Sequence, residues 1–343
     1  MSMSIDTYRP LGRTGVQVSS LCLGTMMFGA WGNTDHDDSI RIIHAALDAG
    51  VNFVDTADVY SAGESEEIVG KALKGRRDDV VLATKFFMPM GEDPNRRGPS
   101  RRWIVTAVEQ SLRRLQTDHI DLYQVHRPDP AVDVEETLGA LTDLVTQGKV
   151  RYIGSSSFSG SEIVEAQWAA REHRLQRFRT EQPPYSPLVR GIELDVLPTA
   201  QRHGMGILTY SPLSGGWLSG NWTADSSPTS PARRRLANRF DMSLPANQRK
   251  LEAVQALATV ADDAGLTLIE LAIAFVINHP AVTSAIIGPR TMEQLESQLP
   301  AADAVLDAAT LDRIDEIVAP GVTINPADNS YGEQVLQPQL RRR

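Results

Sequence analysis

The sequence has a single cysteine, Cys22, among 343 residues. No disulfide can form within the chain, which is typical of proteins from a reducing compartment, so we expect a cytoplasmic protein. Zinc sites built on several cysteines are excluded for the same reason, and the seven histidines are scattered along the chain. We therefore expect no bound metal, and we expect Cys22 to be a small buried side chain.

Long hydrophobic runs are also missing. No apolar stretch approaches the roughly 20 residues that a membrane-spanning helix needs, and the start MSMSIDTYRP has no apolar centre of a signal peptide. Basic residues are outnumbered, since 34 Lys and Arg against 43 Asp and Glu give a formal net charge of −9. We therefore expect binding neither to membranes nor to nucleic acid.

Several common catalytic and nucleotide-binding motifs do not occur. G-x-G-x-x-G does not follow the first apolar run, and the Walker A, H-E-x-x-H and G-x-S-x-G patterns are not found. The usual signatures of Rossmann dehydrogenases, P-loop enzymes, zinc proteases and lipase-like hydrolases are therefore missing.

Short β-branched runs alternate with helical segments along most of the chain. The runs expected to form strands are SSLCLGT, VNFVDTA, VVLATKF, HIDLYQVH, VRYIGSS, RTEQ, GILTYSPL and SAIIGP. Eight strand–helix units indicate an α/β fold of the (β/α)8 TIM-barrel type. An open, doubly wound sheet is the main alternative.

Three segments fall outside the strand–helix units. Residues 7–19 have a Gly-containing turn between two extended runs and are expected to form a hairpin that caps the barrel floor. Residues 214–248 form a long loop after the seventh strand, which places it on the active-site face. We expect one domain over 1–343, with a barrel core at about 18–300 and a polar, extended tail over 321–343.

Four residues stand at or just after the ends of predicted strands: Asp55, Tyr60, Lys85 and His126. Active sites of (β/α)8 barrels lie at this edge. Reduction of a carbonyl needs a hydride donor and an acid that protonates the developing alkoxide. A free tyrosine, with a pKa near ~10, is a reluctant acid, but a nearby ammonium lowers that pKa and an aspartate holds the lysine charged and oriented. These residue types fit hydride transfer better than acyl or phosphoryl transfer.

Each of the four residues also has a simpler interpretation. Asp55 could cap a helix, Lys85 could pair with a surface carboxylate, and Tyr60 and His126 could anchor loops. Their joint position at matching strand ends favours the catalytic interpretation. A lyase or isomerase with a Lys85 Schiff base is a further alternative, although a lysine held by Asp55 would be protonated and a poor nucleophile.

The stretches GVNFVDTADVY, VLATK and IDLYQVH resemble signature segments of the aldo-keto reductase superfamily. GKVRYIGSSSF, TYSPLSGGWLSG and IIGPR resemble further segments in the same order. The resemblance implies a (β/α)8 barrel that reduces small carbonyl compounds with NADPH bound outside a Rossmann fold. It implies Tyr60 as general acid, tuned by Asp55 and Lys85, with His126 placing the carbonyl. It leaves open whether the protein is a monomer or a homo-oligomer.

His126 is followed by Arg127-Pro128, where the aldose-reductase branch has Trp-Pro. This departure puts the chain nearer the bacterial and potassium-channel-β-like branches. The alternative to catalysis is therefore an NADPH-binding regulatory or sensor subunit. Ser157 also departs from the family, which commonly has Asn there, and the shorter side chain is expected to lose one contact with the cofactor carboxamide.

The resemblance further implies a set of cofactor residues. Ser156 and Gln182 would bind the nicotinamide carboxamide, and Tyr210 would stack on the nicotinamide ring. The pyrophosphate would lie against Ser211, Leu213 and Gly215, and the adenosine end against Gly288, Arg290 and Gln294. A guanidinium pairs bidentately with a 2′-phosphate, so Arg290 favours NADP over NAD. The simpler interpretation is that Arg290 faces solvent at a helix start.

An apolar or aromatic substrate pocket is suggested by side chains expected near the barrel mouth, although ordinary core packing would use the same residue types. These are Met26, Met27, Phe28, Trp31, Tyr60, Phe86 and Phe87.

Overall fold

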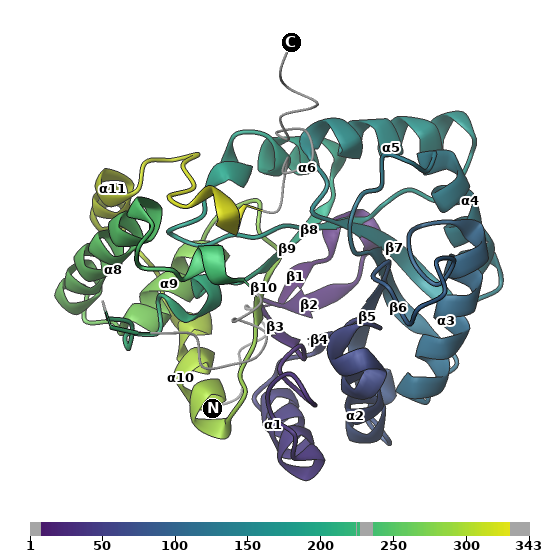
Figure 1. The fold of residues 1–343 in the computed structure, drawn as a ribbon, viewed down its shortest axis with the longest axis horizontal. Coiled ribbons are helices and arrows are strands. Elements are labelled where there is room, and N and C mark those ends of the chain that lie inside the picture. Colours follow the sequence, from purple (N-terminus) through teal and green to yellow (C-terminus); the bar gives the residue numbers. More distant parts are fainter. Residues whose placement is uncertain (1–7, 224, 227–235, 330–343) are drawn as a thin grey trace.

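The computed structural model describes residues 8–223, 225–226 and 236–329 (Figure 1). Eight parallel strands close into a barrel in the order β10-β3-β4-β5-β6-β7-β8-β9. The predicted (β/α)8 barrel is therefore confirmed, and the open-sheet alternative is wrong. Parts of the predicted loop (224 and 227–235) and of the predicted tail (330–343) lie outside the described residues.

Every predicted apolar run contains one barrel strand. The strands are β3 (Leu21–Gly24), β4 (Phe53–Asp55), β5 (Val81–Phe86), β6 (Ile120–Val125), β7 (Val150–Ser156), β8 (Thr180–Gln182), β9 (Gly206–Tyr210) and β10 (Ser284–Ile287). The strands are buried on both faces, because side chains fill the interior and helices cover the outside (Figure 1). Packing across the wall is tight at Gly24, where a Cβ atom would lie 2.5 Å from Cγ2 of Ile286.

Helices follow the strands in the predicted places. They are α1 (His36–Asp48), α2 (Glu64–Ala72), α3 (Arg101–Leu115), α4 (Val134–Thr146), α5 (Gly160–Glu172), α6 (Val196–His203), α8 (Pro245–Asp263), α9 (Leu268–Ile277) and α10 (Met292–Gln298). Local side chains fix several helix starts. Ser159 and Glu162 form a reciprocal capping box at α5, and Thr267 and Glu270 form another at α9.

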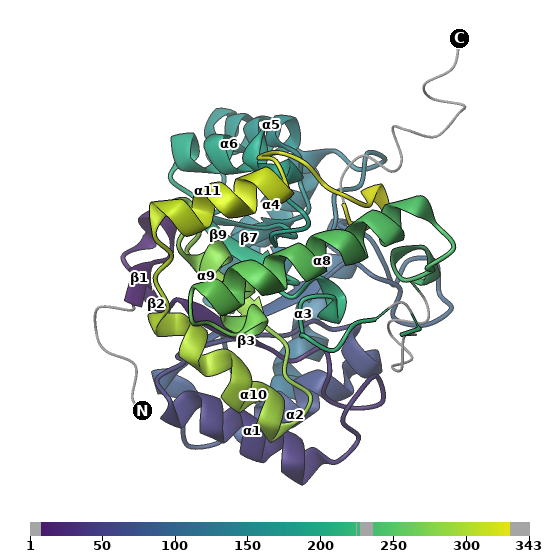
Figure 2. The ribbon, with the colours of Figure 1, turned by 90° about the vertical axis from the view of Figure 1, so that its left-hand side faces the viewer.

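The predicted N-terminal hairpin is present. β1 (Tyr8–Pro10) pairs antiparallel with β2 (Gln17–Ser19), and Figure 2 shows both strands at one end of the barrel. The hairpin contributes Leu11 and Val18, which are fully buried against interior residues that include Cys22. The hairpin thus closes the end at which the strands begin, and Cys22 is a buried side chain as predicted.

The chain after α10 is more ordered than the sequence predicts. An additional helix, α11 (Ala308–Ile317), packs beside α8 (Figure 2). The Ile324 N–H donates to the Leu188 carbonyl at 3.2 Å, and the Lys250 Nζ donates to an Asp328 carboxylate oxygen at 2.6 Å. Polar contacts with distant segments thus fix residues 321–329, and Pro326–Asp328 form a 3-10 turn rather than an extended segment.

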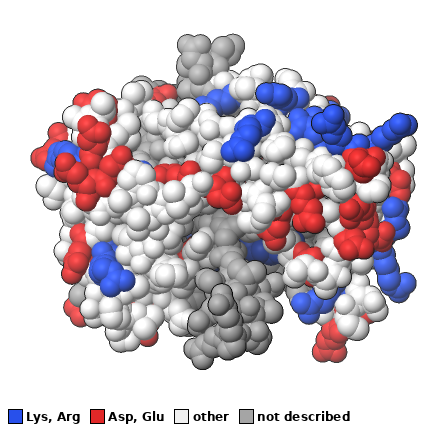
Figure 3. All heavy atoms as spheres, turned by 90° about the horizontal axis from the view of Figure 1, so that it is seen from above, with Lys and Arg blue, Asp and Glu red and all other residues white. Residues whose placement is uncertain are grey.

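Charged side chains are distributed unevenly over the surface. On the face shown in Figure 3, acidic side chains form several groups separated by uncharged surface, and basic side chains gather along one edge. The net negative charge of the chain is thus not collected into one patch on this face. Among the helices that the structure describes, none combines the length and the hydrophobicity required to cross a bilayer.

Candidate active site

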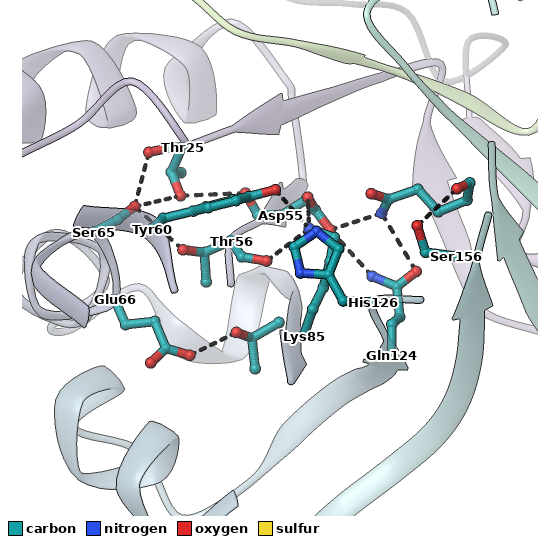
Figure 4. A network of polar contacts seen from close by, with 12 residues as sticks. Thr25, Asp55, Thr56, Tyr60, Ser65, Glu66, Lys85, Gln124, His126 and Ser156 are labelled. Atoms are coloured by element: carbon teal, nitrogen blue, oxygen red, sulfur yellow. Dashed lines mark hydrogen bonds and ion pairs between the residues drawn. The ribbon is translucent and has the colours of Figure 1, made fainter. Parts of the chain in front are cut away.

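The barrel carries the four predicted catalytic residues to one place (Figure 4). Asp55 ends β4, Lys85 is the penultimate residue of β5, and His126 directly follows β6. Tyr60 begins a 3-10 turn, Tyr60–Gly63, in the loop after β4. Because the parallel strands are paired in register, all four residues lie at the carboxyl edge of the barrel.

A buried ion pair forms the centre of this site. The Lys85 Nζ donates to Asp55 Oδ1 at 2.5 Å, to the Thr56 carbonyl at 2.8 Å and to the Tyr60 hydroxyl at 3.4 Å. An ammonium has three N–H donors, so each has an acceptor. A buried ion pair is tolerated only with such complete hydrogen bonding, and here it also orients Lys85 toward Tyr60.

The second carboxylate oxygen of Asp55 binds two glutamines. Asp55 Oδ2 accepts hydrogen bonds from Gln124 Nε2 at 3.2 Å and from Gln182 Nε2 at 3.0 Å. The helix-cap interpretation of Asp55 is wrong, since α2 begins after Gly63. Gln124 was not predicted from the sequence, although it lies two residues before His126 and so on the same face of β6.

Burial controls the protonation of the site. It raises the pKa of Tyr60 above its usual value, against the opposing effect of the Lys85 ammonium. Lys85 lowers this pKa as expected, but desolvation of the phenolate outweighs the attraction, and the pKa of Tyr60 is raised overall. Burial alone would lower the pKa of Lys85, but Asp55 and Tyr60 raise it overall and keep the amine protonated.

His126 is neutral at physiological pH. Burial, followed by the positive charges of Lys85 and Arg127, holds its pKa well below the usual range. Its Nδ1 atom is buried and has no hydrogen-bond partner among the described residues, and its ring lies 6.0 Å from that of Tyr60 at 81°. A neutral imidazole beside a protonated phenol supplies polar groups without a further charge.

The backbone and contacts of the loop after β4 fix the position of Tyr60. Ser61 and Ala62, which follow it directly, have φ values of 48° and 58°, a left-handed conformation that non-glycine residues rarely adopt. The Ser61 Oγ accepts a hydrogen bond from the Trp31 N–H at 3.1 Å, and the Trp31 ring lies 6.0 Å from the Tyr60 ring. The surrounding structure thus maintains a strained turn next to Tyr60.

Two of the expected pocket residues lie elsewhere. Phe28 and Phe86 are fully buried in the hydrophobic core, and the Phe86 ring lies 4.8 Å from the Tyr123 ring. Met26 is 40% exposed. For these two phenylalanines the alternative interpretation, ordinary core packing, is confirmed.

The predicted cofactor residues lie at the ends of the next four strands. Ser156, Gln182 and Tyr210 are the last residues of β7, β8 and β9, and Gly288 follows β10. The Ser156 Oγ donates to the Gln182 carbonyl at 2.9 Å. The Gln182 amide, which was assigned to the cofactor, donates to Asp55 here.

The loop after β9 and the segment at the start of α10 hold the remaining predicted cofactor residues. Ser214 Oγ is buried without a partner among the described residues, and the backbone at Ser211 and Gly215 has φ values of 58° and 68°. No atom lies within 4 Å of a Cβ built on Gly288, so the backbone is open to a ligand there. Gln294 Oε1 accepts from the Arg290 N–H at 2.8 Å, and the Arg290 side chain forms no ion pair with any described residue.

Comparison with known proteins gives matches over most of the chain. The profile of the "Aldo/keto reductase family" matches residues 20–319. An "Uncharacterized oxidoreductase YrpG" of Bacillus subtilis (strain 168) is 42% identical over 322 residues, covering 90% of this chain and 95% of that protein. "Aldo-keto reductase YhdN" of the same organism is 37% identical, covering 97% of this chain and 98% of that protein. A "Probable voltage-gated potassium channel subunit beta" of Arabidopsis thaliana is 36% identical, covering 91% and 96%.

Proposed function

Because the chain belongs to the aldo/keto reductase family and is thus an oxidoreductase, we propose that it reduces aldehydes or ketones to alcohols with NADPH and with Tyr60 as general acid. One observation carries the proposal: the buried Lys85 ammonium bridges the Asp55 carboxylate and the Tyr60 hydroxyl. This arrangement supplies a proton donor whose conjugate base is stabilised by a fixed positive charge.

Each residue of the site has a different role in the proposed reaction. The raised pKa of Tyr60, which burial causes, keeps the phenol protonated until an alkoxide develops nearby. The phenol then transfers its proton to the alkoxide oxygen, and Lys85 stabilises the resulting phenolate while Asp55 holds Lys85 in place. His126, which is neutral, orients the carbonyl oxygen by a hydrogen bond.

NADPH, when bound, supplies the hydride that the carbonyl carbon accepts. Ser156 and Gln182 would hold its carboxamide, and Tyr210 would support the nicotinamide ring. Ser211, Leu213 and Gly215 would hold the pyrophosphate, and Gly288, Arg290 and Gln294 the adenosine end. The Arg290 guanidinium, which forms no ion pair with any described residue, supports a preference for the 2′-phosphate of NADPH over NADH.

Replacement of Tyr60 by phenylalanine tests the proposal. Tyr60→Phe removes the transferable proton and leaves the ring in place, so we expect kcat for 4-nitrobenzaldehyde to fall at least about 100-fold. The loss of NADPH absorbance measures the rate, and a fluorescence titration should give an unchanged NADPH dissociation constant. A Tyr60→Phe variant that retains wild-type kcat would refute the assignment of the acid.

The potassium-channel β relatives support a second candidate, an NADPH-binding regulatory subunit. The comparison of wild type with Tyr60→Phe also distinguishes this regulatory function from catalysis. If wild type and variant both bind NADPH and neither reduces any aldehyde or ketone in a broad panel, the regulatory function is favoured over catalysis.

A further inference from the structure

Arg127 is held rigidly beside the proposed reaction centre. It follows His126 and is half-buried. Its Nη1 donates to the His126 carbonyl at 2.9 Å and to Ser157 Oγ at 2.6 Å. The Ser157 Oγ in turn lies 3.3 Å from the Tyr210 hydroxyl. The guanidinium therefore connects segments that follow β6, β7 and β9, and its position is fixed from two sides.

Ser157, like Arg127, is a position at which the sequence analysis identifies a departure from the family resemblance. Its backbone has φ of 61°, and its short side chain accepts the Arg127 hydrogen bond. Ser157 thus helps to hold the positive charge of Arg127 beside the proposed reaction centre.

The charge of Arg127 is not neutralised within the described part of the chain. Three other arginines of low exposure pair with carboxylates: Arg77 with Asp121 at 2.7 Å, Arg114 with Glu66 at 2.7 Å and Arg190 with Glu193 at 2.8 Å. Arg127 forms no such ion pair among these residues, although its charge is felt by Tyr60 and His126. A partly desolvated guanidinium without a counter-ion is costly unless an anion binds it.

The free donors of Arg127 match a carboxylate. A guanidinium has five N–H donors, and the two hydrogens of Nη1 are used by His126 and Ser157. The Nε–H and the Nη2 hydrogens donate to no acceptor among the described residues. The edge formed by Nε and Nη2 presents two parallel N–H groups, which is the geometry of bidentate carboxylate binding.

We propose that Arg127 binds a carboxylate group of the substrate, so that the preferred substrates are aldehydes or ketones that also carry a carboxylate. The proposal rests on the reductase function and names its substrate class. Carboxylate binding by Arg127 would place the carbonyl of a small acid toward Tyr60 and His126, since Arg127 and His126 are adjacent.

A matched pair of aldehydes tests the proposal. 4-Carboxybenzaldehyde and its methyl ester share a skeleton and differ in charge. We expect the wild type to prefer the carboxylate. Arg127→Gln should lower kcat/KM for the carboxylate roughly 10- to 100-fold, mainly by raising KM, as expected for a lost charge-assisted hydrogen bond. It should change kcat/KM for the methyl ester less than about threefold. Arg127→Lys keeps the positive charge but lacks the two parallel N–H groups of the guanidinium, so its kcat/KM for the carboxylate should lie between those of the wild type and Arg127→Gln. Arg151→Gln, which removes an exposed arginine at the opposite end of β7, is the control and should affect neither substrate.

Equal losses for the two aldehydes would overturn the proposal. So would a rise in the NADPH dissociation constant that accounts for the whole loss, since Arg127 would then serve the cofactor. Benzoate binding to the NADP⁺-saturated protein gives an independent measurement by calorimetry. If the wild type reduces neither aldehyde, the reductase function fails, but benzoate binding that is lost in Arg127→Gln would still support the anion site. Equal or undetectable benzoate binding in both proteins would refute it.

Discussion

The wall of the barrel separates two buried polar networks that differ in what they can do. The inner network, inside the strands, consists of Asp55, Tyr60, Lys85, Gln124 and Gln182. The outer network, between the strands and the helices α2 and α3, consists of Asp58, Glu66, Thr84, Arg114 and Tyr123. Figure 4 shows Glu66 of the outer network apart from the Asp55–Lys85 pair. Successive side chains of a strand point to opposite sides of the barrel wall, so Lys85 belongs to the inner network and its neighbour Thr84 to the outer one.

The outer network also has an ion pair at its centre. Glu66 is fully buried and accepts from Arg114 Nε at 2.7 Å and from Thr84 Oγ1 at 2.6 Å. The carboxyl oxygens of Asp58 and the Tyr123 hydroxyl are buried without hydrogen-bond partners among the described residues. Burial, with a further contribution from Glu66, raises the pKa of Asp58 well above its usual value, so its carboxyl tends to hold a proton.

A buried charge pair is thus not by itself a mark of catalysis. What distinguishes the inner network is Tyr60, a group with a transferable proton at the open edge of the strands. The ion pair of the outer network joins α2 to α3, and its third member, Thr84, lies within β5. We therefore expect changes to the inner network to reduce activity and changes to the outer network to alter stability without a comparable change in activity.

Lys85→Met should have the largest effect, because it lowers both the catalytic rate and the stability of the fold. It removes the charge that stabilises the phenolate, so kcat should fall at least about 100-fold. It also leaves Asp55 buried without its cation, which should lower the free energy of unfolding by about 3–5 kcal/mol. Rate measurements with NADPH and urea denaturation check the two effects. A stable variant with wild-type kcat would contradict the role of the inner network.

Arg114→Met should reduce stability without a comparable loss of activity. Glu66 would remain buried and unpaired, and the free energy of unfolding should fall by about 3 kcal/mol. The kcat of the folded protein should stay within about twofold of wild type. Arg113→Met, an exposed neighbour on α3, is the control and should change the free energy of unfolding by less than about 0.5 kcal/mol. A large fall in kcat for Arg114→Met would remove the distinction between the networks.

The sequence predicted the strands and the four site residues because both depend on local pattern. Each strand is a short apolar run, and a polar residue that closes such a run, like Asp55, must lie at the barrel edge once the fold is known. The family resemblance added the order of these segments. The hairpin was predictable in the same way, from a turn between two extended runs.

Properties that depend on distant contacts were not predictable. Gln124 and Gln182 bind Asp55 only because β4, β6 and β8 meet inside the barrel. The pKa of Tyr60 depends on how deeply the folded chain buries it, which a list of neighbouring charges does not give. The helix α11 was not among the predicted elements, although Leu311, Ile314 and Ile317 recur at helical spacing within it.

Asp58→Asn should have the smallest effect and is the finest test of the comparison. The pKa of Asp58 is raised in the folded protein by burial, so the protonated form is favoured by folding. The stability that Asp58 contributes is complete below the unfolded-state pKa of about 3.9 and is lost as the pH rises toward the folded-state pKa. Asparagine does not titrate, so the variant should match wild type within about 1 kcal/mol at acid pH and become progressively more stable than wild type as the pH rises. Urea denaturation from pH 4 to pH 8 measures this, and kcat should stay within about twofold. If the free energies of unfolding of wild type and variant depend on pH in the same way, Asp58 is ionised in the folded protein. A large loss of kcat in the variant would place Asp58 with the inner network.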